Sequence, residues 1–240
     1  MIYLKYLLFF LSTSSMAQIT LTDRVMDQAN ILSASEKTEL ETLLSEYEKK
    51  TSNQIVVLTI DSLGEQTIED FGYQQARKWA LGTKEKNNGV LFIVAVNDRQ
   101  VRIEVGYGLE DVLTDAQSKM IIERNIVPYF KQGKMDQGVL QGTFAIVRTL
   151  GGDVNSLLEE KSKQDDPSDV WSIAAFFLLI GFLIFFSRWL RKRRGPRSPY
   201  GGGGFWRGGS GGGGGGGGFR GGGGSFGGGG SSGKWTKRHD

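Results

Sequence analysis

The N-terminal two thirds of the chain alternate between helical and strand spacing of apolar residues. Ser33 and Glu36 form the pattern of a capping box, and apolar residues then recur three and four positions apart, which predicts a helix to about Lys50. A β-branched run at 54–60 predicts a strand. A second helix, interrupted by Gly72, is expected over the apolar positions Ile68, Phe71, Ala76 and Trp79.

Two further strands are predicted by contrasting patterns. Residues 90–96 are apolar at every position, as in a strand covered on both faces. Residues 101–105 alternate apolar residues with Arg102 and Glu104, which predicts a half-exposed strand. The three turn-prone residues 97–99 lie between them, so we expect an antiparallel hairpin.

The last predicted elements of the domain are helices. Thr114 and Gln117 form a second capping box, whose helix is expected to stop before Pro128. Another helix is expected from about Asp136 to the glycines at 151–152. This order of elements predicts an α/β fold, a three-layer α/β/α sandwich with a mixed central sheet.

The first residues are typical of a secretory signal peptide. Lys5 precedes a short apolar stretch, and the small residues Ser15 and Ala17 occupy the positions expected before a cleavage site. An uncleaved anchor is the alternative. The expected organisation is a signal peptide at 1–17, the α/β domain at 18–152, an acidic linker at 153–169, a transmembrane helix at 170–190 and a basic, disordered tail at 191–240.

The predicted transmembrane segment is the second apolar region of the chain. Its run from Val170 to Phe186 carries no charge, and with Trp189 and Leu190 it is long enough to cross a bilayer once. Acidic residues precede it and a cluster of Arg and Lys follows it. By the positive-inside rule the tail is cytoplasmic and the domain extracytoplasmic, as the signal peptide also requires, which predicts a single-pass protein of the cell (inner) membrane.

Composition separates the tail from the domain. The 36 glycines lie mostly beyond position 200, and a chain of that composition is not expected to pack a core. The net charge of +3 combines an acidic domain with a basic tail. We expect the basic residues to contact the headgroups of the lipid bilayer. Only two Arg-Gly-Gly triplets follow an aromatic residue, at Arg207 and Arg220, so nucleic acid is not an expected partner.

The absence of two residue types limits the chemistry of the domain. The chain has no cysteine, and its one histidine, His239, is the second-last residue. Disulfides, thiol nucleophiles, zinc–cysteine sites and Ser-His-Asp triads are therefore excluded from the domain. Catalysis there would depend on carboxylates, hydroxyls, Lys, Arg and Tyr, with or without a cation that prefers oxygen ligands.

An acidic stretch follows the second strand of the hairpin. Gly106-Tyr-Gly108 does not predict a dinucleotide loop, because the third glycine is replaced by Asp111 and the surroundings would repel phosphate. Glu110, Asp111 and Asp115 could instead converge on a hard cation, with backbone carbonyls completing an oxygen shell. The alternative is that Asp115 favours a helix N-terminus and the other carboxylates are solvated.

Several motifs in the same order resemble the TPM-domain family, in particular its bacterial members with a signal peptide, one transmembrane helix and a glycine-rich tail that ends near a Trp. The resemblance covers the domain from Thr22 to Leu150. The motifs that carry it are Val25–Ser33, Trp79–Gly82, Asn87–Leu91, Val101–Glu110, Leu113–Ala116, Ile126–Pro128 and Gly138.

The resemblance implies a helix-flanked sheet and several activities reported for the family. Members are associated with photosystem repair, with modulation of membrane receptors, with acid phosphatase activity and with calcium binding. The acidic positions that match are Asp27, Glu110 and Asp115, which become candidate metal ligands, with Ca²⁺ expected ahead of Mg²⁺. Asp111 stands where the family often has a small residue, so the resemblance assigns it no role, and it either adds charge to the site or faces solvent.

Two functions of different class remain open. The first is a non-catalytic, calcium-binding module that acts on a membrane-protein partner in assembly, repair or quality control. The second is a metal-dependent phosphomonoesterase that uses the same carboxylates to hold the metal. Arg102 could help to bind phosphate in that enzyme, although an Arg on an exposed strand is more often a cross-strand partner in solvent.

Overall fold

The computed structural model describes residues 19–164, 178–180 and 219–236. The predicted signal peptide lies outside these residues, as does most of the predicted transmembrane segment 170–190. Within the described residues, no helix combines the length and the apolar character needed to cross a membrane.

A five-stranded mixed sheet forms the centre of the domain, in the order β1-β2-β3-β4-β5. The first three strands are parallel, and β4 and β5 are antiparallel to their neighbours. Both the mixed sheet and the hairpin are therefore confirmed. The strands are β1 (Val25–Asp27), β2 (Gln54–Ile60), β3 (Gly89–Ala95), β4 (Gln100–Gly106) and β5 (Phe226–Lys234).

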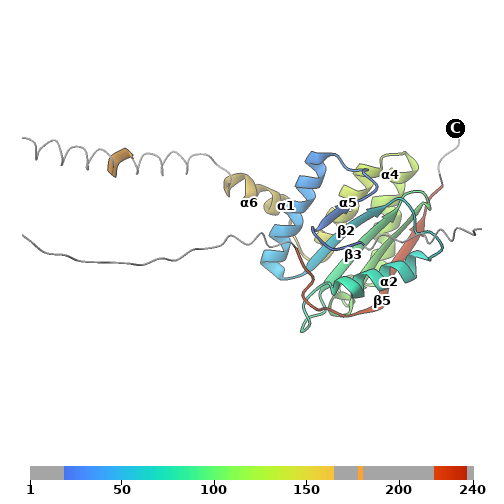
Figure 1. Cartoon of the computed structure of the whole chain (residues 1–240). Helices are drawn as coiled ribbons and strands as arrows, with labels where there is room; N and C mark the ends of the chain where they lie inside the picture. Colours follow the sequence, from blue (N-terminus) through green and yellow to red (C-terminus); the bar gives the residue numbers. More distant parts are fainter. Residues whose placement is uncertain (1–18, 165–177, 181–218, 237–240) are drawn as a thin grey trace, which may run out of the picture.

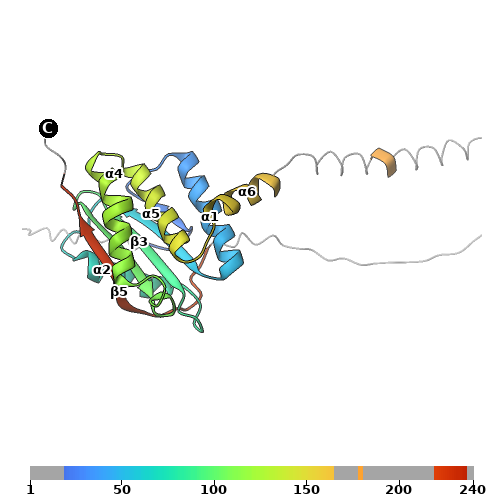
Figure 2. The ribbon, with the colours of Figure 1, turned by 180° about the vertical axis from the view of Figure 1, so that it is seen from behind.

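Helices pack on both faces of this sheet. Figures 1 and 2 show α2 on one face and α1, α4 and α5 on the other. Each face has its own apolar cluster, because alternate residues of the buried strands point in opposite directions. The helices are α1 (Ala34–Thr51), α2 (Ile68–Trp79), α3 (Asp115–Ile121), α4 (Val127–Lys131), α5 (Met135–Thr149) and α6 (Val154–Gln164).

The two predicted capping motifs mark real helix starts. Ser33 is the N-cap of α1, and its hydroxyl and the Glu36 carboxylate satisfy each other's backbone amides. Thr114 is the N-cap of α3, where its hydroxyl accepts from the Gln117 amide at 3.2 Å. Gly72 interrupts the pattern of α2 because the helix packs closely there: a Cβ would lie 2.9 Å from Ile93 Cδ1.

The helical path continues through Pro128, contrary to the prediction that it would stop before this residue. A π-helical segment, Ile122–Ile126, follows α3 directly, and the Val127 amide donates to the Ile122 carbonyl. Pro128 then lies in the first turn of α4, where a missing N–H breaks no hydrogen bond. The predicted stop before Pro128 failed because the π-helical segment lies between α3 and α4, so that Pro128 falls at the start of a new helix rather than inside α3.

Residues predicted to form an acidic linker are partly helical. α6 packs against α1, and its Val154 and Leu157 are each 2 % exposed. The apolar positions in this segment are few but fall on one side, which is sufficient for a short helix that covers an existing core. The ordered domain therefore extends beyond residue 152.

The prediction that the whole tail is disordered is wrong for residues 219–236. β5 belongs to this tail and forms an outer strand of the sheet beside β4. Figures 1 and 2 show it, in red, along the edge opposite β1. Arg102 and Glu104, expected to be half exposed, are buried because α2 packs on that part of β4 and β5 pairs beside it.

Candidate functional site

The structure does not bring the four predicted metal ligands together. Asp27 is the last residue of β1. Strand pairing places it opposite Thr59 of β2, which pairs with Val94 of β3, and Val94 in turn pairs with Val101 near the start of β4. Glu110 follows the other end of β4, beyond Gly106. The five residue-to-residue steps from Val101 to Gly106 alone span roughly 17 Å of strand, so Asp27 cannot share one ion with the other three acids.

Asp27 organises the loop between β1 and α1. Its Oδ1 accepts hydrogen bonds from the Thr59 hydroxyl and from the Ile31 amide, the latter at 3.2 Å, and its Oδ2 accepts from the Leu32 amide at 3.0 Å. A carboxylate that accepts several backbone amides stabilises the loop by satisfying partly buried donors. The structural role of Asp27 is therefore clear from its contacts.

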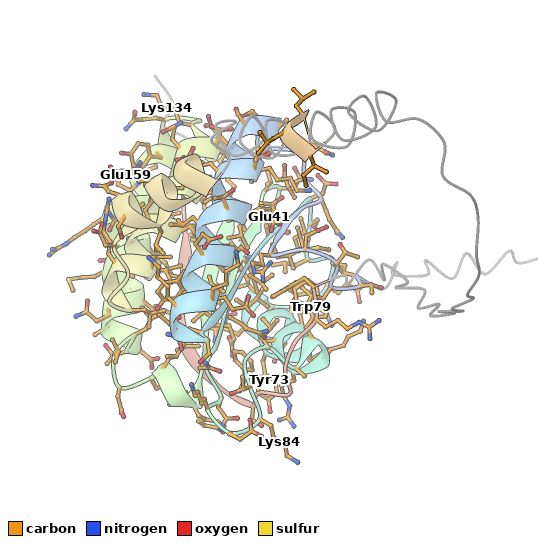
Figure 3. The ribbon with its side chains drawn as sticks, turned by 90° about the vertical axis from the view of Figure 1, so that its left-hand side faces the viewer. Glu41, Tyr73, Trp79, Lys84, Lys134 and Glu159 are labelled. Atoms are coloured by element: carbon orange, nitrogen blue, oxygen red, sulfur yellow. The ribbon has the colours of Figure 1, made fainter. Side chains whose placement is uncertain are left out.

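Glu41 supports the start of β1 from helix α1, where Figure 3 labels it. Its carboxylate accepts the Val25 amide at 2.6 Å. Burial raises the pKa of Glu41, and the hydrogen bond from Val25 opposes that rise. This short first strand, which the sequence analysis did not predict, is thus held by side chains as well as by its pairing with β2.

A second set of polar residues follows the parallel strands. Asp61 and Ser62 come directly after β2, and Asp98 lies in the turn between β3 and β4. Asp98 accepts from the Ser62 hydroxyl at 3.2 Å and from the Leu63 amide at 2.7 Å. The signal for these residues was their position directly after buried strands, where α/β proteins commonly bind ligands.

An open cleft of about 870 Å³ lies at this end of the sheet, beside α2. Its lining combines apolar side chains, four glutamines, two carboxylates and one lysine. Part of one wall is the N-terminal segment, whose Ile19 carbonyl accepts from Gln75 at 3.3 Å and from Trp79, labelled in Figure 3, at 3.2 Å. The lining residues are Ile19, Gln28, Ile60, Asp61, Ser62, Leu63, Gly64, Glu65, Gln66, Phe71, Gln74, Gln75 and Lys78.

Glu110 and Asp115 do lie together, at the opposite end of the sheet from Asp27. With Thr114, Ala116 and Gly229 they line a shallow hollow of about 360 Å³. Asp111 is exposed and is not part of that lining. In the part of the chain that the structure describes, no three side chains of Asp, Glu, His or Cys are placed to hold one metal ion.

The tail strand closes one side of this hollow. The Gly230 amide donates to Asp115 Oδ1 at 2.7 Å, and a Cβ on Gly229 would lie 2.3 Å from Glu110 Oε1. A cation held by Glu110 and Asp115 would therefore contact the tail as well as the domain. No pattern in the sequence predicted that these acids would face a distant glycine strand.

Arg102 forms a buried ion pair instead of a phosphate-binding group. Its Nε donates to Glu104 Oε2 at 2.5 Å, and its Nη2 donates to the Gly228 carbonyl at 3.1 Å. The two residues are 5 % and 0 % exposed. The suggestion that Arg102 could help to bind phosphate is therefore wrong, since its guanidinium is turned into the protein.

Glu104 has one oxygen, Oε1, without a hydrogen-bond partner among the described residues. Burial raises the pKa of this carboxyl, while the nearby Arg102 opposes the rise. An ion pair in such surroundings is costly to break, because either member alone would be a buried charge.

Comparison with known proteins agrees with the family resemblance. The model of the TPM domain matches residues 25–149, more than half of the chain. No match was found among curated proteins. The N-terminal domain of a protein from P. gingivalis, solved by solution NMR, is 32 % identical, covers 54 % of this chain and 82 % of its own, and superposes with a TM-score of 0.51.

Two other solved structures are more distant. The N-terminal domain of a Corynebacterium glutamicum protein is 17 % identical over 58 % of this chain and 86 % of its own, with a TM-score of 0.43. The BA42 protein of the psychrophilic bacterium Bizionia argentinensis is 26 % identical over 49 % of this chain and 83 % of its own, with a TM-score of 0.42. From the extent of the match to the family model, the chain belongs to the TPM-domain family.

Proposed function

We propose that this protein is a membrane-associated, extracytoplasmic TPM-domain module that binds a membrane-protein partner in assembly, repair or quality control, without catalysing a reaction itself. The observation that carries the proposal is the cleft at the carboxyl ends of the parallel strands. In open α/β sheets this end is the usual place for ligands.

The chemistry of the cleft suits an extended polypeptide. Its apolar floor includes Ile60, Leu63 and Phe71. Its four glutamines each carry an amide that can donate and accept hydrogen bonds, and so complement the N–H and C=O groups of a peptide backbone. The lining has two carboxylates, Asp61 and Glu65, against the single cation of Lys78, a balance that disfavours a phosphate group.

The location of the domain rests on two sequence features. Residues 1–17 support export, and the apolar segment 170–190 supports attachment to the membrane. A binding module attached in this way would meet membrane-protein partners at high local concentration.

The calcium part of the proposal rests on Glu110 and Asp115 alone. These carboxylates line one hollow, and carbonyl oxygens and water would have to supply the remaining ligands that Ca²⁺ requires. Asp27 is left out of this set because its oxygens stabilise the loop before α1.

The phosphatase alternative has no comparable support. Its one candidate for binding phosphate, Arg102, is paired with Glu104. A metal in the hollow would have to reverse the charge of an acidic surface before phosphate could approach. Phosphatase activity is therefore an outcome to be tested, not a second proposal.

The cleft is tested by capture of partners from membranes with the full-length protein. Gln74→Arg places a bulky cation on the exposed wall of the cleft, whereas Gln132→Arg makes the same change on an exposed residue outside it. We expect the first variant to lose the membrane proteins recovered with wild type and the second to retain them. Equal recovery with both variants would refute the assignment of the cleft.

The hollow is tested by calorimetric titration with Ca²⁺, and with Mg²⁺ for comparison. We expect Glu110→Gln and Asp115→Asn to abolish calcium binding, and Asp111→Asn to serve as the matched control with binding unchanged. Hydrolysis of a generic phosphomonoester is followed on the same samples. Turnover by wild type that disappears in the two binding variants would show that the protein is a metal-dependent phosphomonoesterase and would refute the non-catalytic module.

A further inference from the structure

β5 is separated in sequence from the rest of its sheet. The described domain ends with α6 at Gln164, and the next segment packed on it begins at Phe219. β5 nevertheless pairs with the whole length of β4, from Gln100 opposite Lys234 to Gly106 opposite Phe226, with one irregularity near Val105. A distant segment of the tail therefore completes the sheet.

Glycine is required in this segment where it approaches backbone carbonyls of the domain. A Cβ on Gly230 would lie 1.9 Å from the Ile103 carbonyl oxygen, and the φ angle of Gly230 is +117°. Cβ atoms on Gly221 and Gly224 would lie 1.9 and 2.0 Å from the carbonyl oxygens of Trp79 and Leu81. The glycines fit a surface that no other residue could approach so closely.

Aromatic side chains at the two ends of β5 bind opposite faces of the sheet. Phe226 is 2 % exposed and belongs to the apolar cluster on the α2 face. Trp235, which directly follows β5, is 6 % exposed and packs on Phe130, with ring centroids 4.5 Å apart, on the other face. The strand is thus held on both sides, although its middle has almost no side chains.

Polar side chains from three parts of the domain bind the backbone of the tail. Asn87 Oδ1 accepts from the Ser225 amide at 2.8 Å. Arg102 and Asp115 bind Gly228 and Gly230 at 3.1 and 2.7 Å, as described above. The domain therefore binds residues 219–236 in three ways: by hydrogen bonds to their backbone, by surfaces that only glycine can approach, and by burial of the two aromatic side chains.

The position of β5 also constrains the membrane topology. Residues 170–190 suffice for one crossing of a bilayer, since each crossing takes about 20 residues. One crossing would place the tail on the opposite side from the domain, where β5 could not pair with β4 of the same molecule. The remaining residues before β5 are basic or rich in glycine and cannot supply a second crossing.

We propose that residues 219–236 are an intramolecular ligand of the domain, and that domain and tail end lie on the same side of the membrane. The outer edge of β4 is then a binding surface for a glycine-rich strand flanked by Phe and Trp. In that arrangement the apolar segment 170–190 does not carry the tail across the bilayer. This inference goes beyond the proposed function and does not require the cleft to bind anything.

The natural absence of cysteine allows a direct test in the full-length protein in its own membranes. Gln100 and Lys234 are opposite each other in the β4–β5 register, so Gln100→Cys with Lys234→Cys is expected to form a disulfide within one molecule on mild oxidation. The control pair, Ser156→Cys with Lys234→Cys, places one cysteine in α6 and the other in the tail, and we expect no disulfide between them. Adding Gly230→Val should abolish the first disulfide, whereas Gly212→Val should not.

Labelling of single cysteines determines the side of the membrane. We expect a membrane-impermeant maleimide to label Lys234→Cys and Ser156→Cys from the same side of intact membranes, since both positions are exposed. Labelling of the tail only after permeabilisation, with no disulfide, would overturn the proposal. So would a disulfide that forms only between two molecules. These results are independent of partner capture by the cleft, so either proposal can fail alone.

Discussion

The interior strands β2 and β3 and the edge strand β5 are held in the sheet by different means. On the side of β2 and β3, every strand residue is buried, and two apolar clusters hold the helices to both faces. On the side of β5, five of the nine strand residues are glycine, so the strand is held by backbone hydrogen bonds and by aromatic residues near its ends. The first region is stabilised by burial of side chains, so we expect the second, with fewer buried side chains, to open more readily than the core.

The largest effect should come from breaking the apolar side. Phe92 is 0 % exposed in the middle of β3, so Phe92→Ala removes a large core side chain and leaves a cavity. We expect a loss of about 3–5 kcal/mol in the free energy of unfolding. Urea denaturation measures this change, and both regions should unfold together. A loss under 1 kcal/mol would show that the core does not depend on this strand.

Removing a tail anchor should have a smaller and local effect. Trp235→Ala takes away the ring that packs on Phe130, and docking of the tail should weaken by about 3 kcal/mol or less. We expect hydrogen exchange to accelerate in β4 and β5 while β2 and β3 remain protected. Trp206→Ala, earlier in the tail, is the matched control. Equal acceleration in all strands would contradict the separation of the two regions.

The buried carboxyl of Glu104 gives the tail edge a pH dependence. Because burial raises its pKa above the ordinary value of 4.5, the folded state binds a proton more readily than the unfolded state. The stabilising effect of that proton is fully present below pH 4.5 and is lost as the pH rises through the raised pKa.

Glu104→Gln tests this sign. We expect the variant to lose the Glu104 part of the slope of unfolding free energy against pH, while Glu123→Gln, on an exposed residue, keeps the wild-type slope. Urea denaturation at a series of pH values measures this slope. A slope identical to wild type would exclude Glu104 as the titrating group.

The smallest effect should come from a cap on the apolar side. Ser33→Ala removes the hydroxyl that accepts from the Glu36 amide and should cost about 1 kcal/mol of stability. Hydrogen exchange at the tail edge should not change beyond this global loss. Thermal unfolding of Ser33→Ala is compared with that of Ser35→Ala, which changes the second residue of α1 instead of its N-cap. The difference between the two variants measures the contribution of the cap. Equal losses in the two variants would mean that the cap adds nothing specific.

Sequence patterns predicted the side of the molecule where side chains carry the structure. The continuous apolar runs of β2 and β3 and the capping boxes at Ser33 and Thr114 all correspond to observed elements. β1 was missed because three residues are too few for a periodic signal. α6 was missed because its few apolar residues appeared to belong to an acidic linker.

The positions of the four candidate metal ligands could be predicted only in part, because they depend on how the strands pair. Glu110 and Asp115 are neighbours in sequence across a helix start, and they line one hollow. Asp27 joined them by family resemblance, and the pairing of four strands places it at the far end of the sheet. The residues of the cleft come from several loops, so no local pattern could assemble them.

The sequence by itself determined the α/β class, the absence of cysteine and histidine chemistry from the domain, and the contrast between an acidic domain and a basic tail. These properties depend on composition and on local periodicity. Only the tertiary structure decided that a glycine-rich segment is a strand, that Arg102 is buried and that the candidate acids are divided between two places. Glycine has no side chain to reveal its structure in a pattern, so its place was decided by the edge of β4 and by the carbonyl groups that it alone can approach.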